Sequence, residues 1–352
     1  MLTFINKLSP FTGQRPKMIC RTAVVLIISF HASIGYSHIN SGKNYNHTNK
    51  SYLGILIPVD PPHYMTIYKH FYKTRTVIVG HFIYQVGTIY GVPVILYTQP
   101  FGGESTRLIG SQIMIDHFNM KLLFYPGTSG AHLPPSKMQI GNIVIGTKQV
   151  NYGDFYMANN GNIDADEFSG KSSMGKYLYL YINPTLERYA ACAATSIQKK
   201  FKLPAWINAN YMPNKSNIFY FGVQGTSTMW VTNKSFVTKL DHVFHVIDGD
   251  GSWYVALAAR LANIPFIEIS TISNSIYEYN DRGFPKQKNH LHSSQQIAQD
   301  ISDNVVLQII KHHGQQLLSK TYNYPPDNPY PAGYYNTPKN SRGILDKCNN
   351  NE

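Results

Sequence analysis

Two kinds of hydrophobic pattern alternate along the chain. Short runs rich in β-branched and aromatic residues predict buried strands at 52–58, 76–80, 82–86, 92–98, 120–125, 140–145, 177–182, 217–222, 228–232 and 265–271. Longer segments with an apolar face or an alanine-rich composition predict helices over 105–117, 184–200, 253–262 and 293–313. This alternation favours an α/β fold, a single domain with a central mixed β-sheet flanked by helices.

Small and polar residues follow two of the predicted strands. One strand is expected to end in a small-residue loop over 126–130, and the last strand ends at Ser273 and Asn274. In open α/β sheets, ligands bind at the carboxyl ends of strands, so Ser273 and Asn274 are predicted to lie at a ligand site. Further turns and loops are expected at 87–91, 156–175 and, with two acidic residues, 248–251.

The amino terminus has the pattern of a secretory signal. Basic residues precede a short apolar core over 23–30, and small residues follow it. This pattern predicts a signal peptide over 1–37, cleaved near Ser37, and a secreted, extracellular or endomembrane-lumen protein. The apolar core is shorter than the roughly 20 residues that span a bilayer, so no stable membrane span is expected. An uncleaved anchor stays an alternative, and translation can start at Met1 or Met18.

The remaining chain divides by composition. Residues 38–51 are polar and are expected to form a flexible lead, residues 52–320 the folded domain, and the Pro/Tyr/Asn-rich residues 321–352 a disordered tail. Four sequons agree with secretion and predict glycosylation at Asn46, Asn49, Asn214 and Asn233. The mature chain keeps Cys192 and Cys348, which could pair in an oxidising compartment. A buried free thiol at Cys192 is the alternative.

Net charge narrows the range of partners only slightly. The chain has 31 Lys and Arg against 19 Asp and Glu, a formal charge of +12, but the basic residues are scattered. Without a basic stripe or run, a nucleic-acid partner is not expected. A basic matrix or adhesion protein that holds acidic glycans stays a minor alternative. The cysteine spacing supports no metal site, and no cofactor is expected.

Five segments carry a family resemblance: Tyr125–Gly130, Gln139–Ile145, Leu203–Asn208, Gly225–Asn233 and Ile264–Asn274. In their order and spacing over about residues 54–313, they resemble the nucleoside phosphorylase and nucleosidase superfamily. In detail the chain is similar to the plant bark and vegetative storage proteins, relatives of methylthioadenosine/S-adenosylhomocysteine nucleosidase. The resemblance implies a fold of the nucleoside phosphorylase type.

The resemblance also implies a nucleoside-binding surface. Cleavage of a purine N-glycosidic bond needs an acid at the base, carboxylates at the ribose and an aromatic ring against the base. By similarity, Gly127, Thr128, Ser129 and Gly130 would lie along the nucleoside, and Trp230 would stack on the base. A tight turn is the structural alternative for the four-residue segment, and a core position is the alternative for Trp230.

The carboxylates of the superfamily are replaced or displaced in this sequence. The aspartate that contacts the purine falls on Asn274, which can hydrogen-bond a base but cannot give it a proton. The Met-Glu pair that binds ribose falls on Asp250 and Gly251, and a one-residue slip would place Asp250 in the glutamate position. An early glutamate falls near Pro62, with Asp60 as the nearest carboxylate. Asp60, Asp250 and Asn274 are therefore the candidate catalytic residues, with solvated turn residues as the alternative for Asp250.

A second glycine-rich segment lies where relatives approach the phosphate or the 5′ side of the ribose. Gly103 precedes a predicted helix that Ser105 opens, and Arg107 follows two positions after Ser105. Backbone amides at a helix start suit an anion, and arginine adds charge. An ordinary loop is the alternative for this segment.

These features predict a secreted protein with a pocket for a purine nucleoside or a similar small molecule, and with weak or lost catalysis. A binding or storage role follows by resemblance. The alternative is an active extracellular nucleosidase or phosphorylase, with phosphate as a further ligand. Relatives form dimers, trimers or hexamers, so a homo-oligomer is also implied by resemblance.

Overall fold

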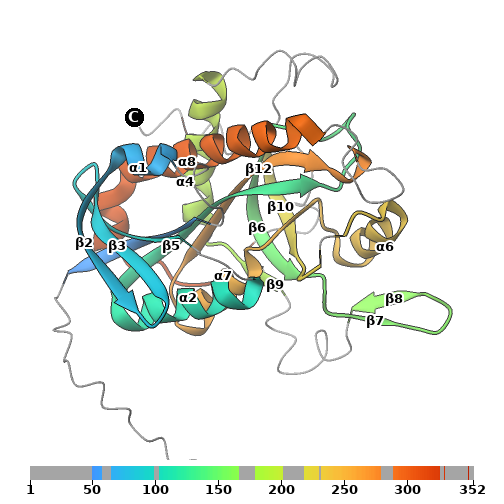
Figure 1. Cartoon of the computed structure of the whole chain (residues 1–352), viewed down its shortest axis with the longest axis horizontal. Helices are drawn as coiled ribbons and strands as arrows, with labels where there is room; N and C mark the ends of the chain where they lie inside the picture. Colours follow the sequence, from blue (N-terminus) through green and yellow to red (C-terminus); the bar gives the residue numbers. More distant parts are fainter. Residues whose placement is uncertain are drawn as a thin grey trace, which may run out of the picture. The chain divides into compact units, whose positions relative to one another are not determined.

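The computed structural model describes residues 50–57, 65–98, 103–165, 179–200, 218–229, 231–278, 288–325, 329 and 348 (Figure 1). Across these ranges, one large mixed sheet runs through the fold in the order β11-β10-β6-β12-β5-β1-β4-β3-β2, with β9 beside β6. Its strands are β1 (Ser51–Ile57), β2 (Phe71–Val79), β3 (Phe82–Ile89), β4 (Val92–Thr98), β5 (Asn119–Ala131), β6 (Ile143–Asn151), β9 (Tyr179–Tyr181), β10 (Ile218–Thr226), β11 (Asp248–Asp250) and β12 (Phe266–Ser275). Two further strands, β7 (Phe155–Met157) and β8 (Ile163–Ala165), form a separate hairpin.

Strand β11 pairs with both β10 and β5. This double pairing closes the strands β11, β10, β6, β12 and β5 into a ring within the sheet. The neighbours of β5 are β1 and β12, both parallel to it, and β11, which is antiparallel. The carboxyl ends of β5 and β12 therefore meet β11 at one edge of the ring.

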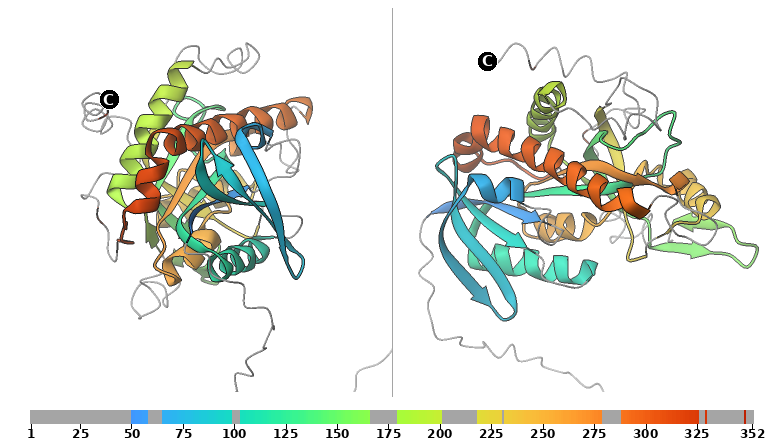
Figure 2. Two further views of the ribbon diagram at one scale, coloured as in Figure 1. Left: turned by 90° about the vertical axis from the view of Figure 1, so that its left-hand side faces the viewer. Right: turned by 45° about the horizontal axis from the view of Figure 1, so that its top comes forward.

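Helices cover both faces of the sheet (Figures 1 and 2). One face carries α4 and α8, and the other carries α2 and α7. The helices are α1 (Met65–His70), α2 (Glu104–His117), α4 (Pro184–Lys200), α6 (Lys234–Phe244), α7 (Trp253–Leu261) and α8 (Lys288–Ser319), with a 3-10 turn η2 (Ile276–Glu278) after β12. No helix in the described part of the chain combines the length and apolarity needed to cross a bilayer.

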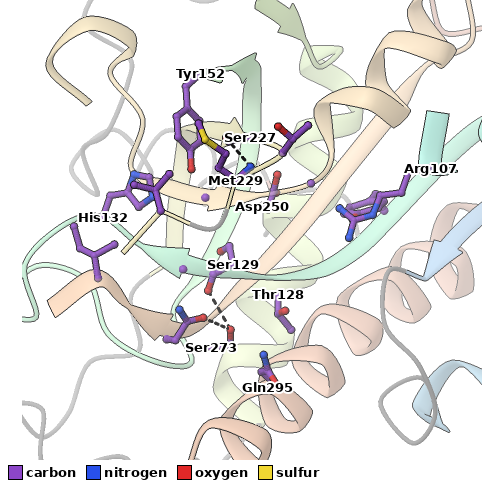
Figure 3. Close-up of a pocket in the computed structure, with 18 residues that line it drawn as sticks. Arg107, Thr128, Ser129, His132, Tyr152, Ser227, Met229, Asp250, Ser273 and Gln295 are labelled. Atoms are coloured by element: carbon purple, nitrogen blue, oxygen red, sulfur yellow. Dashed lines mark hydrogen bonds between the residues drawn. The ribbon is translucent and has the colours of Figure 1, made fainter. Parts of the chain in front are cut away.

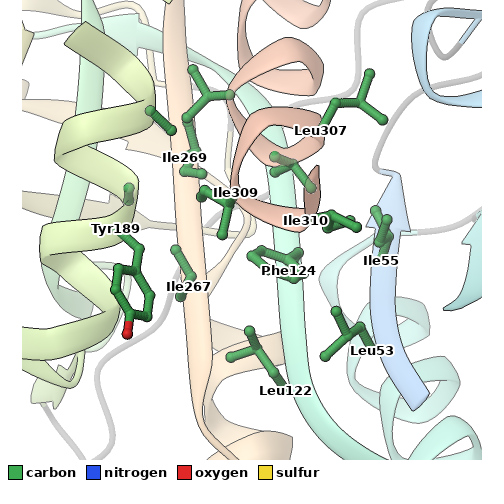
Figure 4. Close-up of a cluster of buried hydrophobic side chains, with 14 of the residues drawn as sticks. Leu53, Ile55, Leu122, Phe124, Tyr189, Ile267, Ile269, Leu307, Ile309 and Ile310 are labelled. Carbon is green, nitrogen blue, oxygen red and sulfur yellow. The ribbon is translucent and has the colours of Figure 1, made fainter. Parts of the chain in front are cut away.

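The largest hydrophobic core lies between the sheet and the α4–α8 layer (Figure 4). Side chains of β1, β5 and β12 meet Leu307, Ile309 and Ile310 of α8 and Tyr189 of α4. All ten residues of β12 are buried. A strand covered by helices on both faces is buried along its whole length, and in β12 the buried residues include polar ones: Glu268, Ser270, Thr271, Ser273, Asn274 and Ser275. The helices predicted at 184–200 and 253–262 are confirmed almost to the residue.

Several local predictions were wrong. Residues 126–130 continue β5 because they pair with β12 on one side and, at Gly130, with β11 on the other. The acidic turn begins as β11, and the strand predicted at 228–232 is absent from its described residues, because β10 ends at Thr226. The turn expected at 87–91 contracts to two residues after Ile89. Part of the 156–175 loop is the β7–β8 hairpin.

The carboxyl-terminal segment is attached to the domain through several described residues, among them Asn323, whose carbonyl oxygen accepts a hydrogen bond from Asn183 Nδ2 at 3.0 Å. Tyr322 and Tyr324 are buried, and the ring of Tyr324 lies against the Arg260 guanidinium, although both tyrosines fall in the predicted disordered tail. Cys348 forms a disulfide with Cys192 of α4, so the free-thiol alternative is wrong.

Candidate functional site

A pocket of about 360 Å³ opens at the edge where β5, β11 and β12 meet (Figure 3). Pockets at the carboxyl ends of parallel strands are the usual ligand sites of α/β folds. The lining residues come from α2, β5, β11, β12, η2 and α8 and from the segments that follow β5, β6, β10 and β11. Among them are the predicted ligand residues Thr128, Ser129, Gly130, Ser273 and Asn274. These predicted segments therefore lie around one cavity.

Ser273 and Asn274, at the end of β12, form part of the pocket wall. The Ser273 hydroxyl donates to Asn274 Oδ1 at 2.8 Å and lies 3.2 Å from the Ser129 carbonyl oxygen. Asn274 is only 7% exposed. The bond to Oδ1 turns the amide nitrogen toward Gly130, where a Cβ atom would lie 3.2 Å from Nδ2. The Asn274 amide is thus presented as a fixed donor at the pocket wall.

Asp250 brings a carboxylate into the same pocket. Its Oδ1 atom accepts hydrogen bonds from the Thr226 hydroxyl at 3.2 Å and from the Ser252 amide at 3.0 Å, and the Ser252 hydroxyl oxygen also lies 3.0 Å from it. Thr226 and Ser252 are fully buried. A carboxylate held by buried donors keeps one orientation, which suits the binding of a polar ligand group. Gly251 also lines the pocket.

Next to Asp250 lies a buried network of hydrogen-bonded polar side chains, which includes Asp248. Gln224 donates from Nε2 to Asp248 Oδ2 at 3.4 Å and accepts from Gln149 at 3.1 Å, while the Ser252 hydroxyl donates to Gln149 Oε1 at 2.8 Å. Burial, followed by the nearby charge of Asp250, raises the pKa of Asp248 well above its ordinary value. Burial and the charge of Asp250 therefore favour the protonated form of Asp248.

Sequence reasoning missed a histidine at this end of the pocket. His132 follows the predicted loop by two residues, and its Nδ1 lies 2.8 Å from Asp241 Oδ1 of α6. The ring of Tyr152 stands edge-on to the imidazole at 5.8 Å. Burial and three nearby aspartates raise the pKa of Tyr152, which keeps its phenol neutral. The only signal in the sequence was a polar residue just beyond a small-residue segment.

The opposite wall carries positive charge. Arg107 of α2 lines the pocket, with its guanidinium 5.8 Å from the centre of the Tyr125 ring. Gly103 and Ser105, predicted with Arg107 as an anion site, are exposed and are not among the residues that line the pocket in the described part of the chain. Of the predicted phosphate or 5′-side residues, Arg107 alone reaches the cavity.

Other predicted residues do not line the cavity. Gly127 precedes the lining segment, and its carbonyl accepts a hydrogen bond from Ser302 of α8 at 2.8 Å. Asn233 is exposed at the start of α6, where its side chain accepts from the Phe236 amide at 3.1 Å. Asp60, Trp230, Asn46, Asn49 and Asn214 lie outside the described residues. Across the described ranges, no cluster of side chains is suited to a metal ion.

Comparison with known proteins identifies the fold. No family model matches the chain, and no curated protein matches it.

Among solved structures, the 5′-methylthioadenosine/S-adenosylhomocysteine nucleosidase of Neisseria meningitidis, in complex with methylthio-immucillin-A, aligns with a TM-score of 0.56 at 15% identity, covering 74% of this chain and 98% of that one. The futalosine hydrolase of Helicobacter pylori gives 0.55 at 12% identity, with 74% and 97% covered. The corresponding nucleosidase of Streptococcus pneumoniae, in complex with 8-aminoadenine, gives 0.54 at 19%, with 74% and 99% covered. The chain therefore has the nucleosidase-type fold that its sequence predicted.

Proposed function

We propose that this chain binds a purine ribonucleoside in the pocket and cleaves its N-glycosidic bond only slowly. The observation that carries the proposal is that a carboxylate, Asp250, and an amide, Asn274, line one cavity with Thr128 and Ser129. A volume of about 360 Å³ is in the range of small-molecule sites. Solved structures of the same fold hold methylthio-immucillin-A and 8-aminoadenine, which supports a ligand of this class.

The polar groups suit the two halves of such a ligand. A fixed carboxylate at Asp250 accepts hydrogen bonds from vicinal hydroxyls, as ribose requires. The donor at Asn274 hydrogen-bonds an acceptor nitrogen of the base. Because an amide cannot transfer a proton, the site lacks the acid that would neutralise the leaving base at that position. General acid catalysis contributes about 10²- to 10⁴-fold, so cleavage is expected to be slower than in a site with an acid at position 274.

An efficient nucleosidase or phosphorylase is the alternative function. The presence of Asp250 in the pocket favours it, since a pocket without any carboxylate could not orient a ribose for attack. Arg107 favours the phosphorylase form, because its guanidinium could hold phosphate. Base release measured with and without phosphate separates these two forms.

Secretion and a storage or binding role are part of the proposal. The disulfide between Cys192 and Cys348 supports an oxidising compartment. The exposed side chain of Asn233 is compatible with glycosylation there. Slow cleavage fits a protein retained for ligand binding or storage. The implied homo-oligomer stays a prediction, and the mass of the purified protein in solution tests it.

The experiment combines binding and base release. Wild-type protein is titrated with inosine, adenosine and methylthioadenosine, and free base is followed with and without phosphate. Saturable binding is expected for at least one nucleoside. Asp250→Asn should weaken it by roughly 10- to 150-fold, because a hydrogen bond to a charged group contributes about 1.5–3 kcal/mol. Asp116→Asn is the matched control, since Asp116 is exposed on α2 and does not line the pocket. Binding of none of the three, or equal affinities for both variants, contradicts the proposal.

A further inference from the structure

Two paired glycines form a flat part of the pocket. Gly130 of β5 lies directly opposite Gly249 of β11, and both line the cavity. Directly paired residues project to the same face, with Cβ positions about 4.5–5.5 Å apart. A Cβ at Gly130 would lie 3.2 Å from Asn274 Nδ2, and one at Gly249 would lie 2.9 Å from His132 Nε2. The Asn274 amide thus lies beside Gly130 and the His132 imidazole beside Gly249, and between them the pocket surface is formed by the backbone of the two glycines.

The imidazole is held in one orientation. Its Nδ1 lies 2.8 Å from Asp241 Oδ1, so Nδ1–H donates to the carboxylate and Nε2 faces the pocket. His132 is 6% exposed, and α6 is anchored beside it by the buried side chains of Leu240 and Phe244. In the described part of the chain, no group hydrogen-bonds to His132 Nε2. A histidine oriented by a carboxylate, with its second nitrogen open to a cavity, has the arrangement of an acid–base group.

Several charged or titratable groups face this histidine. Asp241 reaches it from α6, Tyr152 from the turn after β6, and Asp248 and Asp250 belong to β11 beside it. A Cβ at Gly249 would lie 3.2 Å from the Tyr152 hydroxyl, which therefore stands next to the same glycine as Nε2. Because Asp241 holds Nδ1, Nε2 is the ring nitrogen from which a ligand in the pocket can take a proton.

We propose that His132, positioned by Asp241, is the general acid that protonates the leaving base. This inference rests on the proposed nucleoside function and deepens it. The base would lie over Gly130 and Gly249, with one edge toward Asn274 and another toward His132. As the C1′–N bond breaks, its electron pair goes to the base, which takes the proton from Nε2. Water bonds to C1′ and releases a proton to solvent, and solvent reprotonates His132.

A nucleoside with an activated base tests this step. The base of N7-methylated inosine leaves without protonation, whereas the base of inosine needs a proton. Base release from both is measured in wild type, in His132→Gln and in Asp241→Asn. With inosine, His132→Gln should lower the rate by about 10²-fold or more, because general acids contribute about 10²- to 10⁴-fold. Asp241→Asn should lower it by about 10-fold. With the methylated substrate, both variants should stay within about 3-fold of wild type.

The pH profile and a matched variant complete the design. Release from inosine should fall as the pH rises, because a general acid must be protonated to act, and this limb should be missing with methylated inosine. His242→Gln is the control, since His242 is exposed on the same helix as Asp241. Should His132→Gln fail to fold, the substrate contrast in Asp241→Asn decides the question.

The outcomes separate the two proposals. Equal losses on both substrates, or no loss on either, would overturn the role of His132 while the nucleoside function stands. Wild-type protein that cleaves only methylated inosine would overturn it too, because no acid would then be acting. Protein that neither binds nor cleaves any nucleoside contradicts both proposals.

Discussion

Asn274 is the residue at which this pocket departs most from the chemistry of base release. Its amide is fixed by the Ser273 hydroxyl and turned toward Gly130. It can donate a hydrogen bond to a base, but it holds no transferable proton. The sequence alone indicated this departure, because the identity of one side chain decides it. Its consequence can be tested by restoring the acid.

Asn274→Asp should raise the rate of base release from inosine by about 10-fold or more. The introduced carboxyl would be buried, and burial favours its protonated form, which can give a proton to the base. The rate is measured by single-turnover base release beside wild type. Ser273→Ala serves as a comparison, because it removes the hydroxyl that fixes Oδ1 without adding an acid. A rate for Asn274→Asp no higher than wild type would show that position 274 does not face the reacting base.

The buried carboxyl group of Asp248, behind the same pocket, makes the free energy of unfolding depend on pH. Its pKa is raised above the ordinary value of 3.8 by burial and by Asp250. Between that value and its raised pKa, the folded chain holds a proton that the unfolded chain has lost, so stability falls as pH rises through this window. Asp248→Asn cannot ionise and should lose this fall. Urea unfolding should therefore show the variant gaining stability relative to wild type as the pH rises from 4 to 8. Parallel stability curves would contradict this account.

At the scale of elements, the sequence predicted those whose pattern is local. Helix α7 and strand β12 follow from an unbroken alanine-rich run and a β-branched run. The end of β5 did not, because its small residues become a strand only by pairing with β11 and β12, more than 100 residues away in sequence. The contact of His132 with Asp241, separated by 109 residues, is likewise set by tertiary structure. The segments that line the pocket could therefore be predicted from the sequence, whereas the extension of β5 and the contact between His132 and Asp241 could not.

The core between β12 and α8 provides a test of the architecture (Figure 4). Ile269 of β12 is fully buried there. Ile269→Ala should lower the free energy of unfolding by about 2–5 kcal/mol, since it removes buried methyl groups and leaves a cavity. Ile78→Ala on the edge strand β2, where the side chain is 62% exposed, should change it by less than about 0.5 kcal/mol. Denaturant titrations compare the two, and equal losses would count against the placement of β12.

At the scale of the whole molecule, one covalent bond joins α4 to the end of the chain. Cys192 and Cys348 are 156 residues apart, so the disulfide restricts a long loop in the unfolded chain. Replacing both cysteines by serine should lower the free energy of unfolding by about 2–4 kcal/mol. Thermal melts with and without reductant check this, and wild-type protein in reductant should match the double variant. An unchanged melt, or free thiols in the purified protein, would contradict the pairing.

The central claim is that a nucleoside occupies the pocket at the edge of β5, β11 and β12. A crystal structure with a non-cleavable C-nucleoside analogue tests it most directly. The account predicts the base over Gly130 and Gly249, between Asn274 and His132, with the ribose hydroxyls in hydrogen-bond reach of Asp250. Crystals that show no analogue there at millimolar concentration, or that show it bound at another site, would contradict the account.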